Sequence, residues 1–155
     1  MAWTLYFKDY LSSGHEKSIH EKTVMKRLLI VDDDPDHRLI LRARFEAKGY
    51  GCEEAEDGGV ALSKLKKDQI ALVITELNMP RMNGLQLIGQ MAKLSLLQTT
   101  PAILVTSQSL HEMSSKAYKL GAHAVISKPY DFSKLFGEVA RAIGQSETVG
   151  NPSKS

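Results

Sequence analysis

Five short apolar runs, each followed by a segment with helical periodicity, restrict the fold of this chain more than any other feature. The predicted strands are 28–31, 50–55, 70–75, 102–106 and 124–126. Most of these runs lack polar alternation, which is typical of strands buried on both faces of a parallel sheet. The run at 50–55 contains acidic residues and is predicted to lie at an edge. Strands that alternate with helices form a parallel sheet with helices on both faces, so the chain is predicted to be an α/β protein.

The predicted helices begin at residues that favour helix starts. Asp34 can cap a helix whose first residue is Pro35. Predicted helices cover 35–48, 110–120 and 132–143, and two more begin at positions 58 and 84. Leu87, Met91 and Leu94 are spaced to lie on one face of the helix that begins at position 84.

Composition and charge exclude several classes of protein. The net charge of +2 comes from mixed signs without a basic run, which argues against nucleic-acid binding. A single cysteine, Cys52, indicates a reducing environment and therefore a cytoplasmic protein. No apolar run approaches the roughly 20 residues that span a bilayer. Lys8 and Asp9 interrupt the segment that would form the apolar part of a signal peptide.

The two ends of the chain differ from its body, which is predicted to be one domain over 26–144. Residues 1–25 form an N-terminal extension whose apolar side chains follow helical spacing. These side chains are Trp3, Tyr6, Phe7, Tyr10 and Leu11. Two interpretations stay open, namely a short amphipathic docking helix and a loosely ordered leader. Residues 145–155 are polar and are predicted to be a disordered tail.

Polar residues stand at the carboxyl ends of four predicted strands. They are Asp32 and Asp33, Glu76, Thr106 and Ser107, and Lys128. In open parallel sheets this edge carries the functional site. Clustered carboxylates need a cation, and Mg²⁺ takes such hard oxygen ligands. A lysine and a hydroxyl beside them can bind a phosphoryl oxygen. The set predicts a magnesium and phosphoryl site.

The sequence resembles a known family, the CheY-like receiver domains of bacterial two-component response regulators. The resemblance covers about residues 26–144 and rests on the motifs LLIVDDDP, LVITELNMPRMNG, ILVTS and VISKPY. It implies a flavodoxin-like five-stranded sheet in the order 2-1-3-4-5. It further implies a cytoplasmic, non-enzymatic signalling protein that takes part in a phosphorelay.

The resemblance assigns roles to individual residues of the predicted site. Asp32 and Asp33 match the acidic pair that holds Mg²⁺, and the backbone carbonyl of Asn78 matches a further metal contact. The acid at position 76 completes this set. Thr106 matches the hydroxyl that senses the phosphoryl group, with Ser107 beside it. Lys128 matches the family's lysine, and a cis peptide bond is expected at Lys128-Pro129.

Two positions depart from the family pattern. Glu76 stands where the family has its phosphoacceptor aspartate, and Val125 stands where it usually has an aromatic switch residue. The extra methylene of glutamate moves the carboxylate about 1.5 Å toward the phosphoryl position. The favoured interpretation is a receiver that does not accept phosphate, in which Glu76 partly imitates the phosphorylated state and Mg²⁺ binding is weakened. Two alternatives are an introduced substitution and phosphorylation of Glu76 itself.

Other functions and the output of the domain are also open to prediction. A haloacid-dehalogenase-type phosphatase with Asp32 as nucleophile is the alternative from another class, and a flavin-binding protein is a weaker one. No output domain is recognised after the last helix, so output is expected through protein contacts. The partner would be a histidine kinase, a downstream target or a second copy of the chain. The expected surface includes His111, Lys116, Lys119 and Tyr130.

Overall fold

The computed structural model describes residues 24–144. The predicted N-terminal helix lies in residues 1–23 and the predicted tail in 145–155, both outside the described residues. The described elements follow in the order β1 (Arg27–Val31), α3 (Pro35–Ala47), β2 (Gly51–Ala55), α4 (Gly58–Lys67), β3 (Leu72–Glu76), α5 (Gly84–Lys93), η1 (Leu96–Gln98), β4 (Ala102–Thr106), α6 (Leu110–Leu120), β5 (Ala124–Ser127) and α7 (Phe132–Gly144). No helix within 24–144 is long and apolar enough to cross a membrane.

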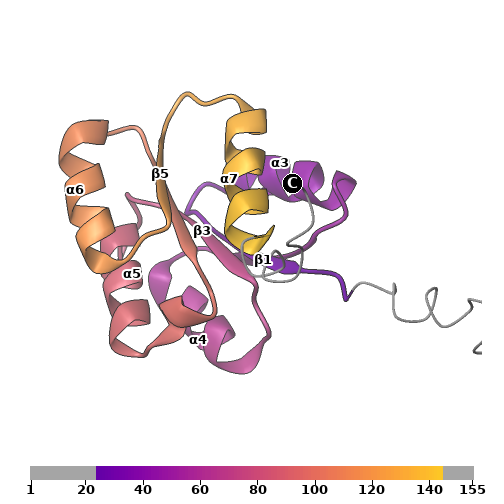
Figure 1. Cartoon of the computed structure of the whole chain (residues 1–155), viewed down its shortest axis with the longest axis horizontal. Coiled ribbons are helices and arrows are strands. Elements are labelled where there is room, and N and C mark those ends of the chain that lie inside the picture. Colours follow the sequence, from indigo (N-terminus) through magenta and orange to yellow (C-terminus); the bar gives the residue numbers. More distant parts are fainter. Residues whose placement is uncertain (1–23, 145–155) are drawn as a thin grey trace, which may run out of the picture.

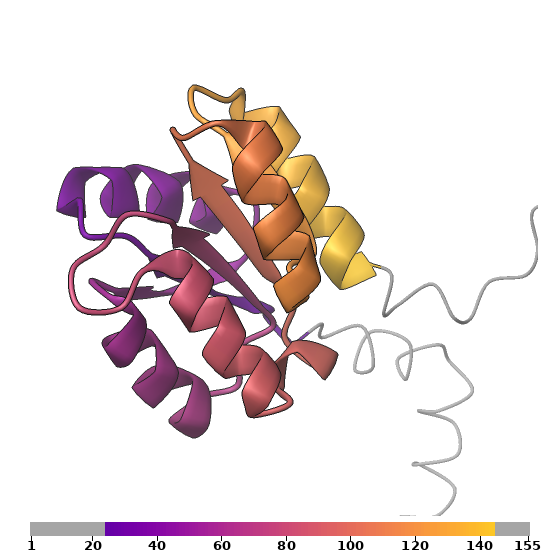
Figure 2. The ribbon, with the colours of Figure 1, turned by 90° about the vertical axis from the view of Figure 1, so that its left-hand side faces the viewer.

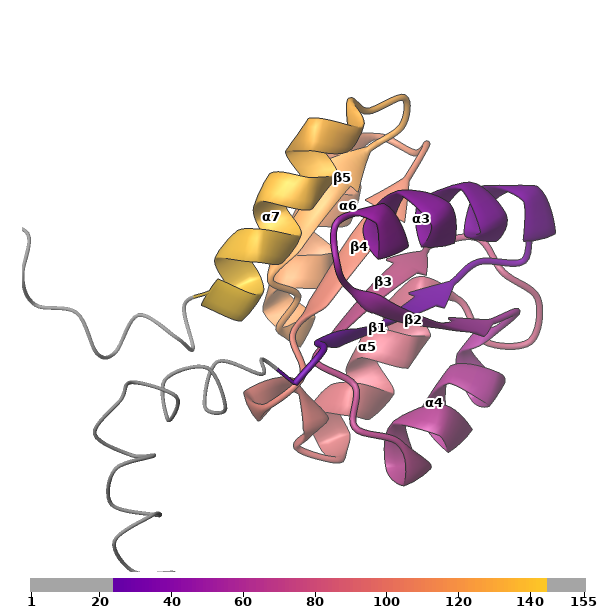
Figure 3. The ribbon, with the colours of Figure 1, turned by 90° about the vertical axis from the view of Figure 1, so that its right-hand side faces the viewer.

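All five strands pair in parallel, in the order β2-β1-β3-β4-β5. This confirms the predicted flavodoxin-like sheet. Figure 1 shows the sheet between α5 and α6 on one side and α3 and α7 on the other. Helices α4, α5 and α6 pack on one face of the sheet (Figure 2), and α3 and α7 pack on the other (Figure 3). The carboxyl ends of β1, β3, β4 and β5 consequently meet along one edge of the sheet.

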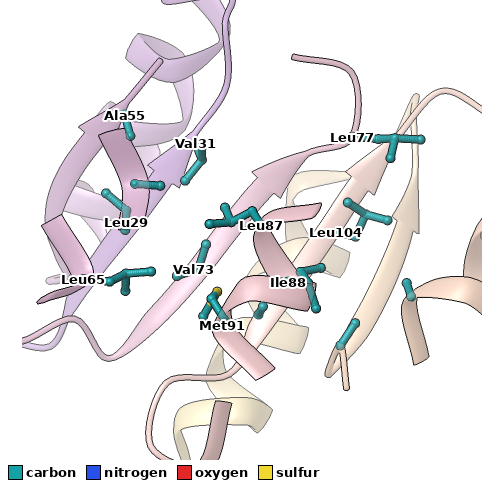
Figure 4. Packing of buried hydrophobic residues seen from close by; sticks show 14 of the residues in the cluster. Leu29, Val31, Ala55, Leu65, Val73, Leu77, Leu87, Ile88, Met91 and Leu104 are labelled. Carbon is teal, nitrogen blue, oxygen red and sulfur yellow. The ribbon is translucent and has the colours of Figure 1, made fainter. Parts of the chain in front are cut away.

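Successive residues of the central strands point to opposite faces of the sheet and pack into two hydrophobic cores. In β1, Leu28 faces the core beneath α3 and α7, whereas Leu29 faces the core beneath α4 to α6. Figure 4 shows the core beneath α4 to α6, in which Leu87 and Met91 of α5 lie against Val73 of β3. All five side chains are 0% exposed, and burial of each such side chain stabilises the fold by about 1.5–3 kcal/mol. The cores therefore fix the strands whose ends carry the polar residues.

The element boundaries differ from prediction in two informative places. β3 begins at Leu72 and includes Glu76, because its ladder pairs with β1 and continues along β4 as far as Glu76. Glu76 is thus a strand residue and not the first residue of the loop. Leu94 is not on the buried face of α5: it follows the last helical residue and is 46% exposed. Ile88 lies on that face, at 0% exposure.

The predicted edge position of the second strand is confirmed, since β2 is the first strand of the sheet. Its two glutamates are paired with arginines from neighbouring elements. Glu53 lies 3.2 Å from Arg27, and Glu54 lies 3.2 Å from Arg38 and 2.9 Å from Arg42. The acidic residues of this edge are thereby held against the sheet and α3.

Candidate functional site

Three polar residues from separate strands meet at the carboxyl edge of the sheet. Asp32 follows β1, Glu76 ends β3, and Lys128 follows β5. The Nζ atom of Lys128 lies 2.6 Å from Oε2 of Glu76 and 4.0 Å from Oδ2 of Asp32. The structure therefore brings together an acid pair and the cation that sequence analysis placed beside it.

The Glu76 carboxylate is almost enclosed, with the whole residue 7% exposed. Its Oε1 accepts hydrogen bonds from the backbone N–H groups of Leu77 and Asn78, at 3.0 and 3.3 Å. Its Oε2 is fully buried and has no hydrogen bond of good geometry within the described residues. The Lys128 ammonium beside that oxygen consequently makes a charge contact, which offsets the cost of burying an anion.

Asp32 is 3% exposed, and protein donors engage both of its carboxylate oxygens. The backbone N–H of Asp34 donates to Oδ1 at 2.9 Å, and Nδ1 of His37 forms a short contact with Oδ2. Burial alone would raise the pKa of Asp32. The hydrogen bonds from His37 and Asp34, with the charges of His37 and Lys128, outweigh burial and lower the pKa below 3.8. Asp32 is therefore a carboxylate at neutral pH.

His37 is the site residue that sequence reasoning missed. It lies in the first turn of α3, five residues after Asp32, and its Nε2 lies 3.0 Å from the hydroxyl of Tyr130. His37 and Tyr130 also line a groove of about 720 Å³ between α3 and the segment after β5. The available signal was a histidine one helical turn after the acidic run, a position that faces the strand end.

The hydroxyl of Thr106 is turned toward the loop after its own strand. Thr106 is 0% exposed, and its Oγ1 accepts the backbone N–H of Gln108 at 3.0 Å. The Gln108 side chain donates in turn to the side-chain oxygen of Asn78 at 3.1 Å. Ser107 is exposed. These contacts join the loops after β3 and β4 across the site.

The remaining predicted positions differ in their exposure to solvent. Asp33 and Asn78 are exposed, whereas Val125 is half-buried and packs against the core beneath α4 to α6. The Lys128-Pro129 peptide bond is cis, as predicted.

The side chains as arranged do not fit a magnesium ion. No group of three or more histidine, cysteine, aspartate or glutamate side chains within 24–144 could hold a metal ion. The physical reason is that protein groups already occupy both buried carboxylates: His37 contacts Asp32, and the Lys128 ammonium contacts Glu76. The magnesium ligand set therefore stays a prediction.

The loop after β3 is fixed by its own polar contacts. The Arg81 guanidinium binds the Asp57 carboxylate, with Nε at 2.9 Å, and Arg81 adopts a φ of 64°. Asn83 caps α5 and exchanges hydrogen bonds with Gln86 in a capping box. A Cβ atom on Gly84 would lie 2.3 Å from the backbone oxygen of Glu76. Glycine here permits the start of α5 to press against the end of β3.

Comparisons with known proteins agree with this geometry. The family model for the response regulator receiver domain matches residues 28–140. Sensor histidine kinase RcsC of Escherichia coli (strain K12) is 37% identical over 102 residues, which are 66% of this chain and 10% of that protein. Transcriptional regulatory protein GlrR of the same organism is 32% identical over 119 residues, which are 77% of this chain and 26% of that protein. The chain thus spans a small part of these relatives.

Solved structures give the same result. A CheY-like receiver domain protein from Methanospirillum hungatei JF-1 superposes with a TM-score of 0.74 at 29% identity, covering 81% of this chain and 99% of that one. TrrA from Thermotoga maritima, in complex with Mg²⁺ and BeF, gives 0.68 at 30% identity, covering 76% and 99%.

The chain belongs to the response regulator receiver domain family of two-component signalling. Domains of this family generally bind Mg²⁺ at the phosphorylation site and interact with histidine kinases and downstream effectors. The phosphatase alternative is not favoured by these comparisons. The side-chain oxygen of Asp34 accepts the N–H of Asp36, so capping explains the acidic spacing on which that alternative depended.

Proposed function

We propose that this chain is a receiver that does not accept phosphate at position 76 and that is held in one signalling state by its own side chains. The observation that carries the proposal is the 2.6 Å contact between Glu76 Oε2 and Lys128 Nζ. A glutamate at the phosphoacceptor position reaches about 1.5 Å farther than an aspartate would. Its charge then meets the lysine that would otherwise neutralise a phosphoryl oxygen.

This arrangement disfavours phosphoryl transfer for two reasons. In-line attack requires the nucleophilic oxygen, the phosphorus atom and the cation in a narrow geometry. The Glu76 carboxylate instead occupies the space beside Lys128, and its Oε1 is held by two backbone N–H groups. A carboxylate carries less charge than a phosphoryl group, which is near −2 at neutral pH. Glu76 is thus a partial imitation of the phosphorylated state.

The same contacts weaken Mg²⁺ binding, because Lys128 holds the carboxylate that would be a ligand. Output passes through protein contacts in the cytoplasm, with a histidine kinase or a downstream target, or between two copies of the chain. The surface expected to make these contacts includes His111 and Lys116 on α6. Without an aromatic side chain at Val125, coupling between Thr106 and that surface differs from the usual switch.

Intact mass measurement tests the proposal. The protein and its Glu76→Asp variant are incubated with Mg²⁺ and acetyl phosphate. The variant is expected to gain one phosphoryl group and the parent none, because only the shorter side chain leaves room beside Lys128. A phosphoryl group on Glu76 of the parent would overturn the proposal. Failure of both proteins to react would mean that the site is a docking surface only and that Glu76 is not the sole obstacle.

A further inference from the structure

His37 contacts Asp32 of the acid pair, and the proposed function does not use this contact. We infer that His37 closes the acidic site from the side of α3, by holding Asp32 and Tyr130 together, so that the site keeps its closed form without a divalent cation. This inference rests on the proposed function, because it concerns the same acid pair. His37 is then a second internal group that occupies a carboxylate of the site, in addition to Lys128, which contacts Glu76.

Both carboxylate oxygens of Asp32 are already in contact with protein groups. A carboxylate binds a cation through oxygens that are free to turn toward it. Here Oδ1 accepts the N–H of Asp34 at 2.9 Å, and Oδ2 is in contact with Nδ1 of His37. The Asp32 side chain is 4% exposed, so a cation reaches these oxygens only by displacing a protein donor.

His37 links Asp32 to Tyr130 through its two ring nitrogens. A carboxylate accepts hydrogen bonds, so Nδ1 of His37 carries the proton that faces Asp32. Nε2 of His37 lies 3.0 Å from the Tyr130 hydroxyl, a group that can either donate or accept a hydrogen bond. Tyr130 is 93 residues away in the sequence. The chain of three side chains therefore ties the first turn of α3 to the segment that follows Lys128.

The acid pair already has a positive charge beside it, the Lys128 ammonium. Lys128 lies 2.6 Å from Glu76 and 4.0 Å from Asp32, so its ammonium already stands between the two carboxylates. A Mg²⁺ ion at Asp32 would meet this ammonium at short range, and the repulsion in a partly buried site is large. Binding of Mg²⁺ consequently needs two changes. The acid at position 76 must be withdrawn from Lys128, and Oδ2 of Asp32 must lose its contact with His37.

A Mg²⁺ titration of matched variants tests the inference, with binding followed by calorimetry and by backbone amide chemical shifts. Glu76→Asp alone is expected to bind Mg²⁺ weakly. Glu76→Asp with His37→Phe is expected to bind about tenfold more tightly, since one charge-assisted hydrogen bond no longer competes for Asp32. Phenylalanine keeps a ring of similar size in place of the imidazole. The parent chain is expected to show the same melting temperature in Mg²⁺ and in EDTA.

His123 supplies the matched control. Its side chain is 22% exposed, against 21% for His37, and its Nε2 lies 3.8 Å from Glu138, away from the acid pair. His123→Phe in the Glu76→Asp background is expected to leave Mg²⁺ affinity unchanged. Tyr130→Phe in that background removes only the hydroxyl that pairs with Nε2 of His37 and is expected to give a smaller gain than His37→Phe.

The inference is overturned if Glu76→Asp alone binds Mg²⁺ as tightly as the double variant, or if Mg²⁺ raises the melting temperature of the parent. If His37→Phe prevents folding, the Tyr130→Phe comparison still decides, because an unchanged affinity there would reject a role for this chain of side chains. The outcome is independent of phosphoryl transfer. A parent that gains phosphate would reject the proposed function, whereas the metal affinities of the variants judge His37 alone.

Discussion

The ion pair between Glu76 and Lys128 predicts a specific pattern in a double-mutant cycle. Lys128→Met leaves the Glu76 carboxylate, whose side chain is 8% exposed, without a cation. Glu76→Gln removes the charge but keeps an oxygen that can accept the N–H groups of Leu77 and Asn78. The first change is therefore expected to cost far more stability than the second.

The magnitude follows from the geometry of the pair. At 2.6 Å, two unit charges attract by about 6 kcal/mol at an effective dielectric constant of 20. The Lys128 side chain is 29% exposed, so water screens part of this energy, and loss of one partner of a fully buried pair costs about 3–5 kcal/mol. We expect Lys128→Met to lower the free energy of unfolding by about 2.5 kcal/mol and Glu76→Gln by about 1 kcal/mol. The double variant is expected to lose about 1.5 kcal/mol, a coupling of about 2 kcal/mol.

Urea unfolding at pH 7, followed by circular dichroism, measures all four proteins. Domains of this size have unfolding free energies of about 5–15 kcal/mol, so losses of this size leave each variant folded in water. Asp131→Asn, at an exposed position before α7, removes a charge but keeps the side-chain oxygen that accepts the N–H of Ser133, and it serves as a control for the general effect of removing a charge. A coupling energy below about 0.5 kcal/mol would refute the reasoning, because it would mean that solvent and not Lys128 balances the Glu76 charge.

Three further perturbations have expected outcomes. Gly84→Ala places a Cβ atom 2.3 Å from the backbone oxygen of Glu76 and should lower the unfolding free energy by about 1–3 kcal/mol; an unchanged urea midpoint would contradict the close approach. Phe45→Ala empties a side-chain site that is 0% exposed and should cost about 3–5 kcal/mol in the same assay. Asp57→Ala should cost about 1–2 kcal/mol at pH 7. The pKa of Asp57 is lowered from 3.8, first by the backbone N–H of the third residue of α4 and then by Arg81. The stability that Asp57 adds is therefore complete above pH 3.8 and lost as pH falls through its lowered pKa, so the difference between parent and variant should shrink in acid.

Local sequence signals located most of the fold. The apolar runs fixed the strands because each lies between helices that cover both faces of the sheet, and Pro35 marked a helix start that the structure contains. The prediction that Leu94 lies on the buried face of a helix was wrong, because helical spacing alone does not say where a helix ends. Its position after α5 is set by the turn that follows Lys93.

The strand-end residues of the site were predictable from the sequence, whereas His37 was not. Positions at strand ends follow from topology, which brought Asp32, Glu76 and Lys128 together as expected. The partner of each carboxylate depends on side-chain direction and length. The length of glutamate already suggested that Glu76 reaches Lys128, as it does. Only the structure shows that His37, from the next helix, contacts Asp32.

The paired glutamates of β2 bear on how copies of this chain can associate. An edge strand exposes backbone groups that can recruit a strand from another molecule. On β2, Glu53 and Glu54 form ion pairs with Arg27, Arg38 and Arg42, so the edge strand carries a cluster of charges. An incoming strand would have to pack beside these charged side chains, so growth of the sheet from one molecule into the next is opposed at this edge. Concentrated solutions should therefore resist β-type aggregation through β2, and high salt, which screens these pairs, should weaken that resistance.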